Sequence, residues 1–206
     1  MTEKERMLSG KLYIARDEEL ARDNKKSRML TRLFNNSTEE QLKYRVELLK
    51  ELFESTGKNI YIEPPFSCDY GCHISIGNNF YANYDCIVID VCKVRIGHNV
   101  FFGPRVCIFT AGHPIDADIR NTGLEYGKPV TIGNNVWIGG NAVINPGVTI
   151  GNNVVIGSGA VVTKDIPDNV IAVGNPCRVF REITDEDKKY WEKQREEYLN
   201  SKNTDR

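Results

Sequence analysis

The stretch VTIGNNVWIGGNAVINPGVTIGNNVVIGSGAVVTKDI, residues 130–166, decides the fold. An aliphatic residue returns at every sixth position, and a second set keeps the same period four places later. The first set is Ile132, Ile138, Ile144, Ile150, Ile156 and Val162; the second is Val136, Ala142, Val148, Val154, Ala160 and Ile166. A period of six fits neither a 3.6-residue helix nor a hairpin meander, and it predicts the stacked short strands of a parallel β-helix. Gly or Asn takes the corners, where positive φ costs these residues little.

The same period is present earlier and is then interrupted. Ile96, Phe102 and Ile108 keep the six-residue spacing, but the stretch CIFTAGHPIDAD, residues 107–118, does not continue it. The interruption predicts a loop extruded from the β-helix at about residues 109–130, with His113 in it. Loops mounted on a rigid scaffold commonly carry function, so we expect the functional residues near this break.

The sequence predicts helices in the segments that flank the repeat. In STEEQLKYRVELLKELFESTG, residues 37–57, the apolar side chains of Leu42, Val46, Leu49 and Phe53 share one helical face. Ser37 followed by Glu40 predicts a capping box, and Gly57 predicts the end of this helix. Residues 18–34 predict a second helix, joined to the first by the turn NNS.

A third helix is expected in ITDEDKKYWEKQREEYLN, capped by Thr184 or Asp185 and packed on the surface with its charges in solvent. The expected organisation is therefore a helical N-terminal domain (1–58), a β-helix (59–183) and a C-terminal helical extension (184–206).

Composition excludes several classes of protein. The chain has 206 residues, of which 40% are hydrophobic, enough for one sizeable core. Its formal net charge of −1 gives no basic field for nucleic acid or an anionic membrane. Without an apolar span or a signal-peptide core, we expect a cytoplasmic protein with reduced cysteines. Cys68, Cys72 and His73 have a spacing unusual for zinc and no second pair, so no metal is expected.

Several stretches together resemble one known family. They are MLSGKLYIARDEEL, YIEPPFSCDYG, NFYANYD, TAGHPID and GKPVTIGNNVWIGGNAVINPGVTIGNNVVIGSGAVVTKDIPDNVIAVGNPCR. The chain resembles the hexapeptide-repeat acyltransferases, and within them the maltose/galactoside O-acetyltransferase group, with the maltose type closest. The resemblance covers nearly everything except about the last twenty residues. It implies a left-handed parallel β-helix with an α-helical N-terminal domain, assembled as a homotrimer with sites between subunits. It also implies acetyl-CoA as co-substrate and a small sugar of the maltose or glucose type as acceptor.

Acetyl transfer to a hydroxyl needs a base, because a free alcohol is a poor nucleophile. Histidine suits this role since its ordinary pKa lies near neutral pH. Of the three histidines, His113 lies off the repeat and matches the family's general base. His98 is expected on the solvent side of a corner, and His73 at the entry to the coils as a surface or supporting imidazole.

The resemblance also implies residues that bind the acceptor. Asn83, in YAN, matches the residue that holds the acceptor hydroxyl, and Asp69 stands where the family has a small polar acceptor-binding side chain. Asp90 binds the acceptor, orients His113 or satisfies a corner of the backbone; the sequence leaves these three open.

Three further positions are weaker candidates. The sugar-binding aspartate of the galactoside relatives aligns near Ala15, but here, as in the maltose type, the aspartate is Asp17. Tyr81 and Trp137 are candidates for the walls of the cleft.

For the donor, the resemblance implies that the backbone amide of Gly140 stabilises the oxyanion. Ser158 matches a position that contacts the pantetheine arm, and Thr163, one turn further on, is a further candidate for cofactor binding. The expected cations for the CoA phosphates are Lys164, Arg178 and Arg181. Since no nucleophile lies beside a base, we expect direct transfer in a ternary complex.

Three other interpretations stay open. The first is another hexapeptide acetyltransferase, with a galactoside, xenobiotic or amino-acid acceptor. The second is a carbonic anhydrase on the same scaffold, which needs three zinc-binding histidines; the spacings of 25 and 15 residues here do not fit its pattern. The third is a non-catalytic trimeric scaffold, which would be indifferent to acetyl-CoA.

Overall fold

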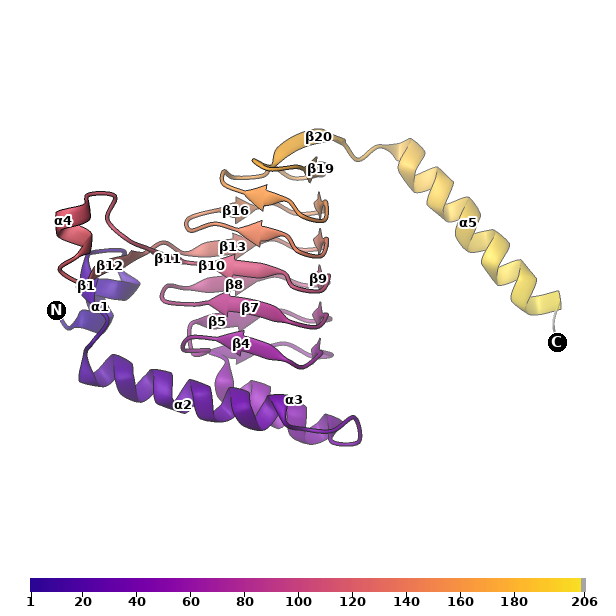
Figure 1. The fold of residues 1–206 in the computed structure, drawn as a ribbon. Helices are drawn as coiled ribbons and strands as arrows, with labels where there is room; N and C mark the ends of the chain where they lie inside the picture. Colours follow the sequence, from indigo (N-terminus) through magenta and orange to yellow (C-terminus); the bar gives the residue numbers. More distant parts are fainter. Residues whose placement is uncertain (205–206) are drawn as a thin grey trace.

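Three short strands make up each coil of a β-helix, and equivalent strands of successive coils pair in parallel (Figure 1). The computed structural model describes residues 1–204. The strands of the β-helix form three sheets, named here sheets 1, 2 and 3 in the order in which the chain enters them. The parallel β-helix predicted from the six-residue period is confirmed.

The sheets have five, seven and five strands. Sheet 1 contains β2 (Ser55–Thr56), β5 (Ile74–Ile76), β8 (Val94–Ile96), β13 (Val130–Ile132) and β16 (Thr149–Ile150). Sheet 2 contains β3 (Tyr61–Ile62), β6 (Tyr81–Ala82), β9 (Phe101–Phe102), β14 (Trp137–Ile138), β17 (Val155–Ile156), β19 (Val170–Val173) and β20 (Arg178–Glu182). Sheet 3 contains β4 (Phe66–Cys68), β7 (Cys86–Ile89), β10 (Cys107–Phe109), β15 (Val143–Ile144) and β18 (Val161–Val162).

The number of residues per coil varies along the chain. Hydrogen-bonded corner residues in adjacent coils are 20 residues apart in the first coils, 36 across the interruption, then 18 and 16. The additional residues lie where sheet 3 gives way to sheet 1, at 69–73, 90–93 and 110–129. We call this corner of the β-helix the loop edge, and the corner between sheets 2 and 3 the 2–3 edge. All departures from the hexapeptide length up to residue 132 therefore stack at one edge.

The inward-facing residues of the period form the core. The six residues from Ile132 to Val162 are at most 2% exposed. At the corner between sheets 1 and 2, asparagines adopt positive φ in coil after coil: Asn59, Asn79, Asn99, Asn135, Asn153 and Asn169. His98 is exposed at this corner, as predicted. Its Nδ1 accepts from the Asn78 amide at 2.8 Å, so it acts as one more corner acceptor.

Two helices cover the first coil and extend its core. α2 (Glu18–Asn35) and α3 (Leu42–Leu52) pack on each other and against β4 and β2 (Figure 1). Leu30, Phe34 and Leu49 join the same hydrophobic cluster as the β-helix interior. An open end of a solenoid would expose apolar side chains, and the helical pair removes that exposure.

The expected boundaries of the helix in residues 37–57 are wrong. α3 begins after Gln41 with no side-chain cap, and the Ser37 hydroxyl instead donates to the Phe34 carbonyl at the end of α2. The buried face contains Leu48 and Leu52, while Leu42 is 49% exposed. The chain leaves the helix before Gly57 because residues 55–56 already pair with the second coil.

The N-terminal segment reaches the loop edge. α1 (Glu3–Leu8) is followed by β1 (Tyr13–Ile14), which pairs antiparallel with β12 (Leu124–Gly127). β12 also pairs with β11 (Ala111–Gly112), and α4 (Ala117–Arg120) lies between them in the sequence. The interruption is thus an ordered excursion fastened to the N-terminus.

The C-terminal end closes with β20, antiparallel to β19, and then α5 (Asp185–Thr204) leaves the body (Figure 1). Thr184 caps α5, because its hydroxyl accepts from the Asp187 amide and the Asp187 carboxylate accepts from the Thr184 amide. The expectation of a surface-packed helix is wrong: residues 188–202 are all exposed. Residues 205–206 of the expected extension lie outside the described residues. In residues 1–204, no helix has the length and apolar character needed to span a membrane.

Candidate active site

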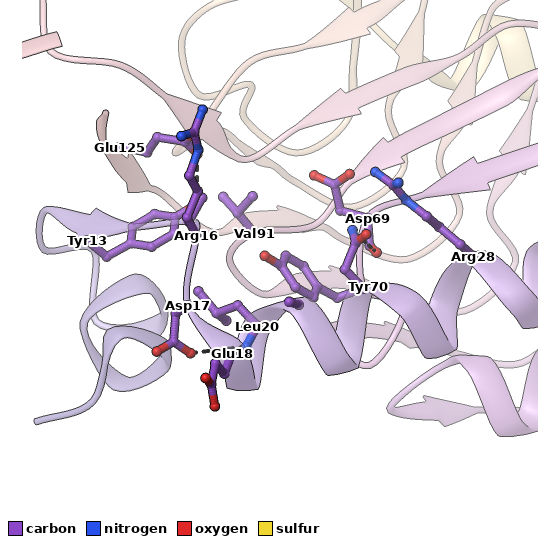
Figure 2. Close-up of a pocket in the computed structure, with 13 residues that line it drawn as sticks. Tyr13, Arg16, Asp17, Glu18, Leu20, Arg28, Asp69, Tyr70, Val91 and Glu125 are labelled. Carbon is purple, nitrogen blue, oxygen red and sulfur yellow. Dashed lines mark hydrogen bonds between the residues drawn. The ribbon is translucent and has the colours of Figure 1, made fainter. Parts of the chain in front are cut away.

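A cavity of about 600 Å³ opens at the loop edge, between α2 and the irregular corners (Figure 2). The N-terminal segment, the first two coils and β12 all contribute to its walls. Polar groups that line it include Arg16, Asn24, Arg28, Asp69, Tyr70 and Glu125. Carboxylates and guanidinium groups from four separate segments thus face one space, which suits a ligand with many hydroxyl groups.

Asp69 is held by its backbone and leaves its carboxylate to the cavity. Its amide donates to Asp90 Oδ1 at 3.0 Å, and its carbonyl accepts from Asn24 Nδ2 at 3.0 Å. Among the described residues the carboxylate has no hydrogen-bond partner. Burial raises the pKa of Asp69, the nearby Arg28 guanidinium lowers it, and Glu125 raises it. Asp69 therefore offers two free acceptor oxygens on a fixed backbone.

Asp90 does not line the cavity, since it is completely buried beneath it. Its Oδ1 accepts from the amides of Asp69 and Tyr70, so of the three roles left open, backbone satisfaction is the one observed. Burial raises the pKa of Asp90 to about 7. The expectation that Asp90 touches the acceptor is corrected, because no surface of it is accessible.

His73 is also buried, at 2% exposure, so of the two expected positions, surface or supporting, it takes the supporting one. Its Nδ1 lies 2.7 Å from the Asp90 carbonyl and must donate, because a carbonyl oxygen only accepts. Burial lowers the pKa of His73. The residue links two stacked corners and is not available as a base.

Asp17 lies at the cavity but is used as a helix cap. Its Oδ1 accepts from the amides of Glu19 and Leu20 at 2.9 and 3.2 Å, at the start of α2. Amides at a helix N-terminus need such an acceptor, which explains this side chain without a ligand.

The loop that carries His113 is fastened at its base by Thr110. This buried residue donates its hydroxyl to the Ile89 carbonyl at 2.8 Å and accepts from the Cys92 amide at 2.9 Å. Its own carbonyl accepts from Lys128, where the loop returns. Both ends of the excursion are thereby joined to the coil below.

His113 follows directly on this base and is exposed. A Cβ on Gly112, the residue before it, would lie 2.6 Å from the Tyr126 ring, so a larger residue there would have to displace that ring.

The 2–3 edge holds a second group of the expected residues. Asn83, Gly140 and Ser158 follow β6, β14 and β17, and therefore stack along this edge. In residues 1–204 no hydrogen bond uses the Gly140 amide, whereas Asn83 Oδ1 accepts from Tyr84. The edge thus presents a free amide of the kind that an oxyanion requires.

The aromatic candidates lie on the outer face of sheet 2. Tyr61, Tyr81, Phe101 and Trp137 are aligned by the strand register, and the rings of Tyr61 and Tyr81 stack at 6.0 Å. Trp137 is 56% exposed. These side chains form an apolar wall next to the 2–3 edge.

The expected phosphate cations lie near the C-terminal end. Thr163 and Lys164 follow β18 and are exposed, while Arg178 donates to the Cys177 carbonyl. Arg181 makes a bidentate ion pair with Asp187, at 2.6 and 2.8 Å. This pairing lowers the pKa of the Asp187 carboxyl. Within residues 1–204 Lys164 has no ion-pair partner, whereas Arg181 is already paired with Asp187.

Sequence reasoning missed Arg28, Thr110 and Glu125. Thr110 had a signal, since it is a polar residue where the period stops. Arg28 and Glu125 had none, because only the packing of α2 and β12 brings them to the cavity. No group of three or more potential metal ligands occurs in the described residues.

Comparison with known proteins agrees with this architecture. A family model described as the maltose acetyltransferase hexapeptide capping motif matches residues 6–57, and the bacterial transferase hexapeptide model matches residues 129–164. The galactoside O-acetyltransferase of Escherichia coli (strain K12) is 48% identical, over 91% of this chain and 92% of its own.

Two solved structures are similar to this chain in both fold and sequence. A maltose O-acetyltransferase from Clostridium difficile 630 has a TM-score of 0.89 at 59% identity, covering 89% of this chain and 98% of that one. A galactoside acetyltransferase in complex with coenzyme A has a TM-score of 0.89 at 48% identity, covering 91% and 94%.

The chain therefore belongs to the hexapeptide-repeat acyltransferases, in the group of the maltose and galactoside O-acetyltransferases. It is an acyltransferase of the kind that takes its acetyl group from acetyl-CoA.

Proposed function

We propose that this enzyme transfers an acetyl group from acetyl-CoA to a hydroxyl of a small sugar of the maltose or glucose type. The observation that carries the proposal is the cavity at the loop edge, into which the free carboxylate of Asp69 projects and which Glu125 also lines. A carboxylate accepts from two neighbouring sugar hydroxyls at once. The absence of an aspartate at Ala15 supports a glucosyl over a galactosyl acceptor.

His113 is the general base of the proposed reaction. Its imidazole takes the proton of the acceptor hydroxyl while that oxygen attacks the thioester carbonyl. The amide of Gly140 stabilises the oxyanion, and Asn83 orients the attacking hydroxyl. When the C–S bond breaks, the proton passes from His113 to the CoA sulfur. Lys164, Arg178 and Arg181 bind the CoA phosphates. Ser158, Thr163 and Trp137 contact the pantetheine arm of CoA. Tyr81 contacts the acceptor.

The proposed site is shared between subunits of a homotrimer. Asp69 and the His113 loop belong to the loop edge, whereas Asn83 and Gly140 belong to the 2–3 edge, and sheet 3 separates the two edges. One chain therefore supplies only half of the proposed machinery at either edge. In a threefold assembly the loop edge of one subunit meets the 2–3 edge of the next, which completes each site.

Thiol release from acetyl-CoA tests the reaction, with maltose, glucose and a galactoside as acceptors. We expect sugar-dependent release that is highest with the glucosyl acceptors and falls by about 10²- to 10⁴-fold in His113→Ala. Wild type that releases thiol with none of the sugars would contradict the acceptor. Full activity in His113→Ala would contradict the base.

Mixed trimers test the shared site. His113→Ala and Asn83→Ala are each expected to be nearly inactive alone. Co-expressed, they form mixed trimers in which some interfaces combine an intact His113 with an intact Asn83 of the neighbour, so activity returns. Recovery supports the trimer; no recovery in trimers shown to be mixed would place both residues in one subunit's site.

We also propose a cytoplasmic location. All six cysteines are unpaired, and burial raises the pKa of each thiol. Such thiols fit a reducing compartment, and thiol titration of protein purified under argon checks this.

A further inference from the structure

A buried carboxylate lies directly under the acceptor cavity. Asp90 is completely buried, and its Oδ1 accepts from the backbone amides of Asp69 at 3.0 Å and Tyr70 at 2.9 Å. Both of these residues line the cavity, while Asp90 does not. The contact between Asp90 and the cavity is thus made entirely through the backbone of its neighbours.

The two amides depend on this carboxylate. They lie in the irregular corner 69–73, where the extra residues take the backbone out of register with the next coil, and among the described residues no backbone carbonyl accepts from them. At other corners exposed asparagine side chains accept from such backbone amides. For example, Asn78 Oδ1 accepts from the Lys58 amide at 2.8 Å. At the loop edge the acceptor is a buried, ionisable group. An amide left without it would be a buried unsatisfied donor, which costs about 1–3 kcal/mol.

Asp90 is itself held in place by the corner that it supports. The Nδ1 of His73, on the same corner as Asp69, donates to the Asp90 carbonyl at 2.7 Å. Contacts therefore run in both directions between the corners 69–73 and 90–93. The other oxygen, Asp90 Oδ2, has no partner in residues 1–204, so the side chain is anchored through Oδ1 alone.

We propose that Asp90 is a positioning residue for the acceptor: by fixing the amides of Asp69 and Tyr70, it sets the direction in which the Asp69 carboxylate enters the cavity. The inference rests on the proposed function, since Asp69 is there the acceptor-binding group. Asp90 acts through Asp69, so its loss weakens sugar binding and leaves acetyl-CoA binding unchanged.

The test compares variants of Asp90 in the sugar-dependent thiol-release assay. Asp90→Asn keeps an oxygen acceptor, so its KM for the sugar is expected within about threefold of wild type. Asp90→Ser is too short to reach both amides, and its KM for the sugar is expected to rise about tenfold or more, with KM for acetyl-CoA unchanged. Should Asp90→Ser not fold, Asp90→Glu, one methylene too long, replaces it with the same expectation.

Two controls separate positioning from general stability. Asp168 Oδ1 accepts from the Asn152 amide at an exposed corner. Asp168→Ala removes a comparable corner contact away from the cavity, so it should lower Tm without changing either KM. In an Asp69→Ala background, Asp90→Ser should add almost nothing to the KM for the sugar, because the group that it positions is gone.

The outcomes distinguish this inference from the function on which it rests. An unchanged sugar KM in Asp90→Ser, or equal increases in both KM values, would overturn the positioning role while the acetyltransferase stands. Fully additive effects of Asp69→Ala and Asp90→Ser would overturn it too. Wild type without sugar-dependent thiol release would overturn the proposed function itself and the inference with it.

Discussion

The phenol of Tyr13 donates a hydrogen bond of 3.0 Å to the carboxylate of Glu125, a residue 112 positions further along the chain. Tyr13 is almost completely buried and pairs with Glu125 in the β1–β12 register as well. Burial, and next the Glu125 charge, raise the pKa of Tyr13, so the phenol keeps its proton. One strand of two residues thus ties the N-terminus to the loop that carries His113.

Tyr13→Phe should loosen this loop. The variant loses only the hydroxyl, and a bond to a charged, half-buried acceptor contributes about 1–2 kcal/mol to the free energy of unfolding. Urea unfolding measures the loss, and faster amide exchange is expected in residues 111–127. Tyr44→Phe, at an exposed helical position, is the matched control. Equal effects of the two substitutions would show that the pair does not hold the loop.

His98→Asn should change neither the stability nor the activity of the protein. His98 stands in a column of corner acceptors with Asn78, Asn134 and Asn152, and its own amide donates to Asn134 Oδ1 at 2.8 Å. Asparagine supplies the same acceptor, so stability should stay within about 0.5 kcal/mol of wild type with full thiol-release activity. His98→Leu should lose about 1 kcal/mol in the same unfolding assay. A large activity loss in His98→Asn would reveal a catalytic part for this histidine.

Replacing Asp90 should change how stability depends on pH. Its pKa is about 7 in the folded protein because of burial, against about 4 in an unfolded chain. The folded state therefore binds the proton more tightly, and wild-type stability falls as pH rises through this window.

The asparagine in Asp90→Asn does not ionise. As pH rises from 4 to 8, the free energy of unfolding of this variant should therefore increase by about 1–3 kcal/mol relative to that of wild type. Urea unfolding at several pH values measures this difference. An equal stability difference between Asp90→Asn and wild type at pH 4 and at pH 8 would contradict the assignment.

Asp187→Ala should strengthen binding of acetyl-CoA. Asp187 holds the Arg181 guanidinium in a bidentate pair, so a CoA phosphate must share that group with it. Releasing Arg181 should lower the KM for acetyl-CoA by about two- to fivefold, with less effect at high salt. Glu186→Ala removes the neighbouring charge and serves as control. An equal drop in both variants would indicate net charge alone, and a rise in Asp187→Ala would show that the pair orients Arg181 for the phosphate.

Local pattern predicted some elements well and others badly. Residues 130–166 specified the strands and the core because every coil places an apolar side chain at the same inward-facing positions. The end of α3 was misplaced because nothing in residues 37–57 indicates that residues 55–56 pair with Ser75 and Ile76. For α5, the sequence predicted a charged helix packed on the surface, but packing depends on where the rest of the fold lies, and residues 188–202 are all exposed.

The candidate site divides in the same way. His113 was found because it lies off the repeat and matches the family's general base, and Asn83 because it matches the family stretch YAN; their roles remain proposals. For Asp90 the sequence left backbone support as one of three roles, but it did not predict the burial of the side chain, because that burial depends on the corner 69–73 of the preceding coil.

The sequence by itself determined the β-helix, its inward-facing residues and the place of the interruption, because a six-residue period is a local property repeated many times. Only the tertiary structure decided that the irregular corners stack at one edge and that Tyr13 meets Glu125 there. It also decided that Asp90 is sealed beneath Asp69. These relationships depend on which residues of successive coils lie above one another. That register accumulates from the length of every coil before it, and no short stretch of sequence contains it.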